Sequence, residues 1–297
     1  MTKKLLLMML GLLLTSNILY SSNLSEKTTN NSNILMPKKQ AKIRTNDHKP
    51  SELLPKTNKV TDENYLSSLT LNGKKYYKNS VDMELAYVAA GSYITEKTSA
   101  EDSLTTTHKV TINKSFLIGR FEVTQHEYHK IMKINPSNFR GKNNPVEEVT
   151  WFNAVNYCNK LTSIEHSNGT LKKGYIYRLP SEVEWEFAAK GGNKSKGYIY
   201  SGSNDLNSVA WYANNSNNET HSIGQKLPNE LGLHDMTGNV WEWCRDSVGP
   251  NISNTLRACR GGSFIGTPKL CNLSYQFYLP PDLNFPALGL RVVLVSE

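Results

Sequence analysis

Apolar and polar residues alternate regularly only from about residue 79 onward. After Met83, the apolar residues Leu85, Tyr87 and Ala89 occupy every second position, which is the pattern of a strand with one buried face. Further apolar positions continue this pattern at Val110, Ile112, Phe116 and Ile118. The pattern therefore predicts a folded domain over residues 79–297 that begins with short strands.

Apolar residues recur at helical spacing in two longer stretches. Thr124 and Glu127 stand three residues apart, the spacing of a capping box, and predict the start of a helix that ends before Pro136. A second helix is predicted from Thr150, with an apolar stripe that includes Cys158. Because that stripe faces a core, Cys158 is expected to be buried or disulfide-bonded rather than reactive.

A short third helix is predicted from Ser181, with Glu184 in its first turn and Gly191-Gly192 as its stop. Beyond it the chain consists almost entirely of turns. The profile is thus one of two main helices, short strands and long, turn-rich connections. Loops of such length are usually functional or ordered by an ion.

The first 22 residues have the features of a secretory signal peptide. Lys3 and Lys4 precede an apolar run from Leu5 to Leu14, which is short for a bilayer span. Ser21 and the residue after it offer a cleavage point, but an uncleaved N-terminal anchor is the open alternative. Either way, the segment predicts an exported protein of the periplasm, the cell surface or the medium.

Residues 23–78 are rich in Asn, Lys, Ser and Thr and show no sustained apolar period. Such a segment buries too little surface to offset its ordering entropy, so a disordered tether is predicted there.

Much of the formal net charge of +8 comes from lysines that precede the domain. The charge therefore indicates a solvated leader and tether rather than a nucleic-acid partner, and membrane contact is expected only through an uncleaved N-terminal segment.

Four cysteines lie within the predicted domain, at Cys158, Cys244, Cys259 and Cys271. An export compartment would allow disulfides among them. Four cysteines permit three pairings, and the sequence does not choose among these.

The most distinctive stretch is GLHDMTGNVWEWC, residues 232–244. Glu242 stands between two tryptophans after a Gly-Asn turn, and Asp235 precedes that turn. These carboxylates, with backbone carbonyls from Gly238 to Val240, could supply the oxygen ligands that calcium prefers. The alternative is a turn capped by Asp235 beside a half-buried tryptophan pair.

This stretch, the Arg-Gly-Gly-Ser sequence at 260–263 and the Gly-Leu-Arg sequence at 289–291 resemble the sulfatase-modifying factor family, which includes the formylglycine-generating enzymes. Shorter matching motifs occur in the same order at 119–124, 135–137, 145–147 and 178–186. The resemblance implies an α+β, C-type-lectin-like fold with little regular secondary structure. It also implies a calcium site with side-chain ligands Asp235 and Glu242 and carbonyl ligands Gly238 and Val240.

The same resemblance implies where an activity would reside. Formylglycine-generating enzymes oxidise a cysteine of a client sulfatase, using copper and oxygen at two cysteines behind the Gly-Gly-Ser motif. Ser263 and Cys271 match two of the family's site positions, but Gly266 stands at the first cysteine position. Because monovalent copper requires both thiolates, Ser263 and Cys271 are interpreted as remnants of a catalytic site.

Two hypotheses follow from these residues. The first is a non-catalytic exported module whose groove, lined by Trp241, Tyr275 and Tyr278, binds a protein or a glycan. The second is a copper-dependent oxidase that converts a sulfatase cysteine to formylglycine.

Two histidines, His126 and His129, have no neighbouring metal-ligand pattern and are expected to be a surface pair.

Overall fold

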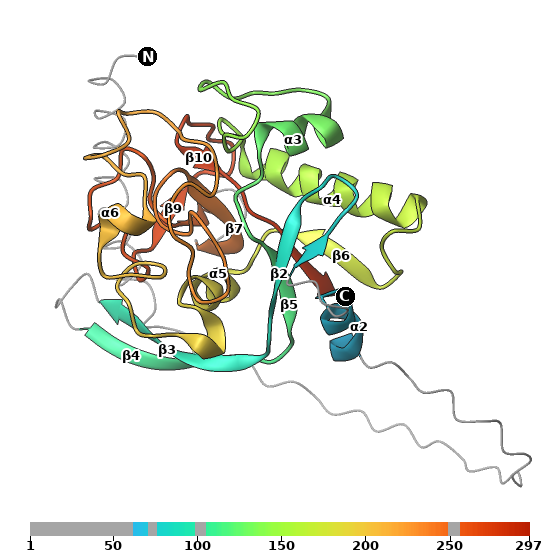
Figure 1. The fold of residues 1–297 in the computed structure, drawn as a ribbon, viewed down its shortest axis with the longest axis horizontal. Coiled ribbons are helices and arrows are strands. Elements are labelled where there is room, and N and C mark those ends of the chain that lie inside the picture. The colour runs from blue at the N-terminus through green and yellow to red at the C-terminus, as the bar shows by residue number, and fades with distance from the viewer. Residues whose placement is uncertain (1–61, 71–75, 99–104, 249–255) are drawn as a thin grey trace, which may run out of the picture.

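The computed structural model describes residues 62–70, 76–98, 105–248 and 256–297 (Figure 1). The predicted leader, residues 1–22, and the tether as far as residue 61 lie outside the described residues. The described helices and strands, in chain order, are α2 (Asp62–Thr70), β1 (Tyr77–Lys78), β2 (Glu84–Val88), β3 (Gly91–Thr98), β4 (Thr105–Ile112), β5 (Phe116–Gly119), α3 (Gln125–Met132), α4 (Trp151–Ser167), β6 (Tyr175–Arg178), α5 (Glu182–Ala189), the 3-10 helix η1 (Gly192–Lys194), α6 (Leu206–Val209), β7 (Trp241–Val248), β8 (Leu256–Arg260), β9 (Phe277–Leu279), β10 (Leu288–Gly289) and β11 (Val293–Ser296).

The strands form three separate sheets. The largest has the order β1-β2-β5-β11-β6, and the C-terminal strand β11 pairs antiparallel with both β5 and β6. A second sheet has the order β10-β7-β8-β9, while β3 and β4 form a two-stranded ribbon. Figure 1 shows this ribbon along one side of the molecule, away from α3 and α4. The mixture of small sheets, few helices and long connections confirms the predicted α+β class.

Three helices begin with the capping chemistry that the sequence encodes. Thr124, Thr150 and Ser181 each accept a hydrogen bond from the backbone of the third helical residue, whose side chain reaches back to the cap. The helices α3 and α4 then pack against each other through Tyr128 and Tyr157, whose ring centroids lie 5.3 Å apart. The predicted starts of all three helices are therefore confirmed.

The predicted tether is wrong in its last part. Helix α2 lies within residues 23–78, and Leu66 in this helix is 1% exposed and belongs to the main core. Tyr65 packs against Tyr175, with ring centroids 4.3 Å apart. The helix is short and mostly polar, so its few apolar residues did not form a recognisable period in the sequence. Those apolar residues nevertheless pack against the core.

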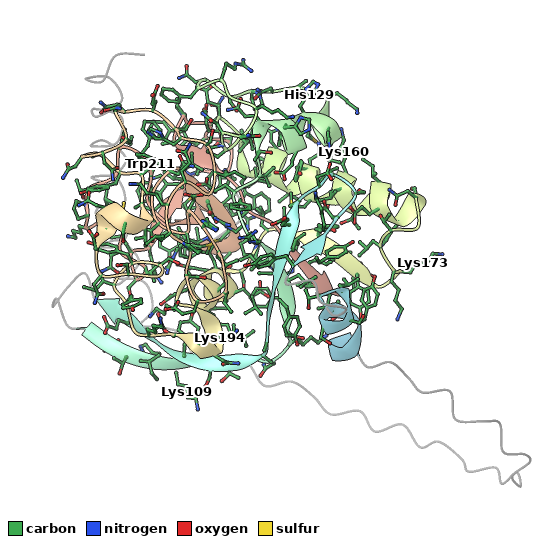
Figure 2. The ribbon with its side chains drawn as sticks, in the orientation of Figure 1. Lys109, His129, Lys160, Lys173, Lys194 and Trp211 are labelled. Atoms are coloured by element: carbon green, nitrogen blue, oxygen red, sulfur yellow. The ribbon has the colours of Figure 1, made fainter. Side chains whose placement is uncertain are left out.

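The described helices include none that is both long and apolar enough to cross a membrane. Figure 2 shows the labelled lysines Lys160 and Lys173 on the side of α4, away from Lys109 and Lys194 near the β3–β4 ribbon. The positive charge of these four side chains is therefore spread over the surface rather than gathered in one patch.

Candidate functional site

Arg291 and Glu242 form a fully buried ion pair within the domain. Arg291 Nη2 lies 2.6 Å from Glu242 Oε1, and Nε donates to both carboxylate oxygens at 3.0 Å. Trp185 Nε1 donates to Glu242 Oε2 at 2.6 Å. The remaining guanidinium donors reach the carbonyl oxygens of Gly119 at 2.9 Å and His234 at 3.0 Å. The pair is thus satisfied on both sides, as a buried pair must be.

Two further carboxylates lie close enough to act on this pair electrostatically. Glu122 and Asp235 both contribute to raising the pKa of Arg291, together with Glu242. Burial, followed by repulsion from Asp235 and Glu242, raises the pKa of Glu122 well above its usual value. Burial also raises the pKa of Asp235 to about 6. We call Glu122, Asp235, Glu242 and Arg291 the charged centre; it holds three acidic groups against one guanidinium.

The predicted calcium ligands fit this centre only in part. Both oxygens of Glu242 already accept hydrogen bonds from Arg291, whose positive charge disfavours a divalent cation beside it. Asp235 differs, because Oδ2 accepts from the Gly224 backbone at 2.7 Å while Oδ1 is buried without a partner. Among the described residues, no group of three or more His, Cys, Asp and Glu side chains has the arrangement of a metal site. Calcium therefore stays a prediction, with Asp235 as the better supported ligand.

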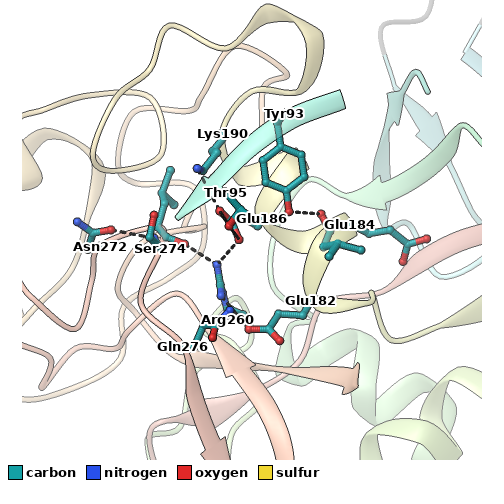
Figure 3. A network of polar contacts seen from close by, with 12 residues as sticks. Tyr93, Thr95, Glu182, Glu184, Glu186, Lys190, Arg260, Asn272, Ser274 and Gln276 are labelled. Carbon is teal, nitrogen blue, oxygen red and sulfur yellow. Dashed lines mark hydrogen bonds and ion pairs between the residues drawn. The ribbon is translucent and has the colours of Figure 1, made fainter. Parts of the chain in front are cut away.

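A second buried guanidinium lies in the Arg-Gly-Gly-Ser sequence (Figure 3). Arg260 is fully buried and pairs with Glu182 at 2.9 Å and Glu186 at 3.1 Å, both on α5. Its Nη2 also donates to the Leu273 carbonyl oxygen at 2.6 Å. Glu186 is further bound by Lys190 at 3.1 Å. Arg260 therefore fixes the segment around Leu273 against α5.

A groove of about 530 Å³ opens beside this network. One wall is the segment 269–275, and the others are β3 and the loop that follows η1. Its lining residues are Ile94, Glu96, Lys190, Ser195, Gly197, Tyr198, Ile199, Lys269, Asn272, Leu273, Ser274 and Tyr275. Ile94 is 55% exposed and Ile199 is 51% exposed, so the groove carries accessible apolar side chains. A volume of this size falls in the range of ligand sites.

The aromatic residues predicted to line a groove have different positions. Trp241 is 1% exposed and packs against Phe277, so its predicted exposure in a groove is wrong. The reason is that the Trp241 side chain points into the main core cluster, to which Phe277 also belongs. Tyr275 does line the groove. Tyr278 does not, and its hydroxyl instead reaches the Gln276 side chain at 3.2 Å.

The positions of the family's copper cysteines lie next to each other in space. A Cβ atom on Gly266 would stand 3.2 Å from Cys271 Sγ and 3.0 Å from the Ser263 carbonyl oxygen. Ser263 is fully buried, and its Oγ has no hydrogen-bond partner. We call Ser263, Gly266 and Cys271 the sulfur locus. Position 266 is therefore adjacent to the Cys271 thiol, but the locus contains a single sulfur.

All four cysteines are free and buried, so none of the three possible pairings occurs. Burial raises the pKa of Cys271 to about 12, which leaves its thiol protonated and unreactive at neutral pH. Cys271 packs in a small cluster with Leu206, Ala210 and Tyr212. Cys259 belongs to the main core cluster instead. No second thiol from Cys259 therefore supplies the missing sulfur.

The histidine pair on α3 borders a shallow hollow of about 290 Å³ with Arg140 and Lys142. Partial burial, followed by repulsion from Lys142, lowers the pKa of His126. His129 is exposed and His126 is half-buried, which agrees with their interpretation as a surface pair.

Sequence reasoning did not identify the roles of Arg260 and Arg291. Both were recognised as motif residues, but their partners lie 49 to 78 positions away in the chain. A usable signal was present, because an arginine within an apolar, glycine-rich motif becomes buried and then requires carboxylate partners.

Comparison with known proteins extends this picture. The family described as "Sulfatase-modifying factor enzyme 1-like domain" matches residues 72–295. "Chaperone protein LppX" of Paenibacillus barcinonensis is 35% identical over 258 residues, which covers 72% of this chain and 90% of that protein. The "Formylglycine-generating enzyme" of Streptomyces coelicolor is 28% identical over 178 residues, 50% of this chain and 52% of the enzyme.

Among solved structures, "Treponema denticola variable protein 1" superposes with a TM-score of 0.63 at 29% identity. The superposition covers 75% of this chain and 98% of that one. The likeness therefore spans nearly the whole of that protein and the greater part of the domain described above.

Proposed function

The chain belongs to the sulfatase-modifying factor family, and from that premise we propose that it is a non-catalytic, exported binding module whose groove holds an extended segment of a client protein. The observation that carries the proposal is the contrast between two neighbouring features. The sulfur locus holds one buried thiol, whereas the adjacent groove of about 530 Å³ is open and partly apolar.

The lack of a second thiol supports a non-catalytic role. Monovalent copper is bound by soft ligands, and glycine offers no side chain to bind it. At Gly266 the chain therefore does not fit the metal, and Cys271 alone is both buried and protonated at neutral pH. We assign no redox step to this site.

The groove has features that suit an extended polypeptide. Ile94 and Ile199 are accessible to apolar side chains, and Tyr275 adds an aromatic surface. Asn272 and Ser274 offer hydrogen-bonding groups in the same wall. Arg260 holds that wall in place through the Leu273 carbonyl. The wall therefore loses less conformational entropy when a ligand binds.

A protein client is favoured over a glycan by the relative from Paenibacillus barcinonensis, whose name describes a chaperone. Export of the chain rests on the predicted leader at residues 1–22. A glycan ligand is the competing outcome of the binding test below.

The copper-dependent oxidase is the second candidate, and one observation favours it. A Cβ atom on Gly266 would lie only 3.2 Å from Cys271 Sγ, so a cysteine side chain at position 266 would begin beside that thiol. An oxidase would nevertheless need a second soft ligand from outside the described residues.

We also propose that Asp235 is a ligand of a bound calcium ion. Oδ1 of this side chain is buried and unpaired, and the charged centre carries more carboxylates than cations. A divalent cation at Asp235 would relieve that imbalance. Glu242 is not needed for this role, because Arg291 already neutralises it.

Binding of a fluorescent, permanently unfolded polypeptide such as carboxymethylated lactalbumin tests the module. We expect Ile94→Ser with Ile199→Ser to weaken binding at least about fivefold, since each substitution removes apolar surface from the groove. Leu227→Ser is the matched control, because Leu227 is 62% exposed but does not line the groove. Equal binding by the groove variant and the wild type would remove the proposal, and competition by a neutral oligosaccharide would favour the glycan ligand.

A further inference from the structure

We propose that a second hollow, beside the first half of α4, binds a carboxylate side chain from an acidic peptide segment of a partner protein. The hollow has a volume of about 320 Å³ and lies between α4 and residues of β6, β7 and β8. It shares no lining residue with the groove next to Tyr275. The two hollows are therefore separate binding surfaces.

Two arginines of the hollow are not neutralised. Among the described residues, neither Arg245 nor Arg257 forms an ion pair. Arg178, which also lines the hollow, differs because Glu184 binds both of its terminal nitrogens at 2.7 Å. The hollow thus contains two positive charges that an anion would neutralise.

Arg257 is held in place but leaves donors unused. Its guanidinium lies 4.0 Å from the ring centroid of Trp151, and Nη1 donates to the Arg245 carbonyl oxygen at 3.1 Å. Nε is buried and has no hydrogen-bond partner. A buried, unpaired donor is unfavourable, and the planar guanidinium matches a carboxylate that accepts two hydrogen bonds. The stacking fixes the arginine in advance of binding.

The aromatic residues beside the hollow favour a peptide over a sugar acid. Trp151 has one face covered by Arg257, and its Nε1 donates to the Cys244 carbonyl oxygen at 2.9 Å. Phe152 meets Trp151 edge-on and is 55% exposed. An apolar side chain next to the acidic residue would pack on Phe152, which has no polar group to bind a sugar hydroxyl.

The hollow offers no reactive group. Cys158 lines it, but burial raises the pKa of this thiol to about 12. Recognition is therefore reversible and depends on charge and apolar contact.

The test is a titration of the full chain with the blocked hexapeptide Gly-Leu-Glu-Leu-Glu-Gly, followed by NMR. We expect the Arg257 side-chain N–H signals and the backbone amides near Phe152 to shift, because the carboxylate accepts hydrogen bonds from the guanidinium. The matched peptide with glutamine in place of glutamate should bind at least about fivefold more weakly, since it lacks the charge. Raising the salt concentration should weaken binding of the acidic peptide.

Three variants locate the site. Arg257→Gln should reduce affinity for the acidic peptide at least about tenfold. Arg257→Lys should retain only part of the wild-type affinity, because lysine keeps the charge but lacks the planar guanidinium that donates two hydrogen bonds to a carboxylate. Arg245→Gln, at an exposed position, tests the hollow even if the Arg257 variants fold poorly. Arg140→Gln is the charge-matched control on a different surface. Unchanged affinity in folded Arg257→Gln or Arg245→Gln, equal binding of the glutamine peptide, or no binding at all would overturn the proposal.

Discussion

The Arg291–Glu242 pair of the charged centre and the sulfur locus differ in how completely their polar groups are used. In the charged centre, the Arg291 guanidinium donates to two carboxylate oxygens and two carbonyl oxygens. In the sulfur locus, Ser263 Oγ has no partner, and the Cys271 thiol has a backbone hydrogen bond with Ser263 in addition to its packing contacts.

This difference separates fold from activity. Removing Arg291 or Glu242 would leave the other charge buried without its partner, so the fold depends on this pair. The sulfur locus contains no such ion pair, and Gly266 has no polar side-chain group that would need a partner. The family's fold can therefore persist in a chain that has lost the family's chemistry.

The largest effect is expected from Arg291→Met. The substitution leaves Glu242 buried without its cation and should reduce the free energy of unfolding by about 3–5 kcal/mol, measured by denaturant titration. Combining it with Glu242→Met should recover much of the loss, because the double variant has no unpaired charge. A loss below about 1 kcal/mol in the single variant would show that the pair is not central to stability.

Calcium should have the next largest effect, and it acts on the same centre. At a concentration about a hundred times its Kd, bound calcium would add about 2.7 kcal/mol to the free energy of unfolding. Melting curves with calcium and with a chelator measure this, and Asp235→Asn should abolish the difference. Coincident curves for the wild type would count against a calcium site.

Glu147 shows how a buried carboxylate behaves without a guanidinium partner. Burial is the main cause that raises its pKa to about 8, although the Phe139 backbone amide donates to it at 2.7 Å. The folded state therefore binds a proton that the unfolded state releases at lower pH, so stability falls as pH rises from about 4.5 to 8.

Glu147→Gln removes this titration. Between pH 5 and pH 8, the wild type should lose on the order of 2 kcal/mol more of its unfolding free energy than the variant does. Parallel denaturant titrations across that range measure the two slopes. Identical slopes would mean that Glu147 is ionised in the folded protein.

The smallest of these effects is expected in the sulfur locus. Cys271→Ser places a hydroxyl where a buried thiol packs and should cost about 1–2 kcal/mol of unfolding free energy. Thermal melting of the variant beside the wild type is sufficient to measure it. A loss as large as that of Arg291→Met would erase the difference between the two regions.

Local signals in the sequence predicted the helix starts well, and long-range partners poorly. Thr124, Thr150 and Ser181 carry their capping chemistry within three residues, so their helices could be read directly. Glu242 was correctly recognised as an acid that needs a cation, but that cation is Arg291, 49 residues later. Only tertiary packing decides between an arginine and a metal ion.

The groove illustrates the same limit. Tyr275 was correctly expected to line it, whereas Trp241 is buried because its side chain packs in the main core cluster. Helix α2 was missed because it has only three apolar residues, Tyr65, Leu66 and Leu69, which are too few to show a sustained period. Contacts between distant segments, and not local preference, determine these positions.

The most direct test is mass spectrometry of a Cys-x-Pro-x-Arg peptide incubated with the protein, copper and oxygen. We expect the wild type to leave the cysteine unchanged, because the sulfur locus provides one thiol. Gly266→Cys, whose Cβ would lie 3.2 Å from Cys271 Sγ, should raise copper(I) affinity by more than about tenfold. Conversion of the peptide cysteine to the aldehyde by the wild type, and its loss in Cys271→Ser, would contradict the account and establish the oxidase.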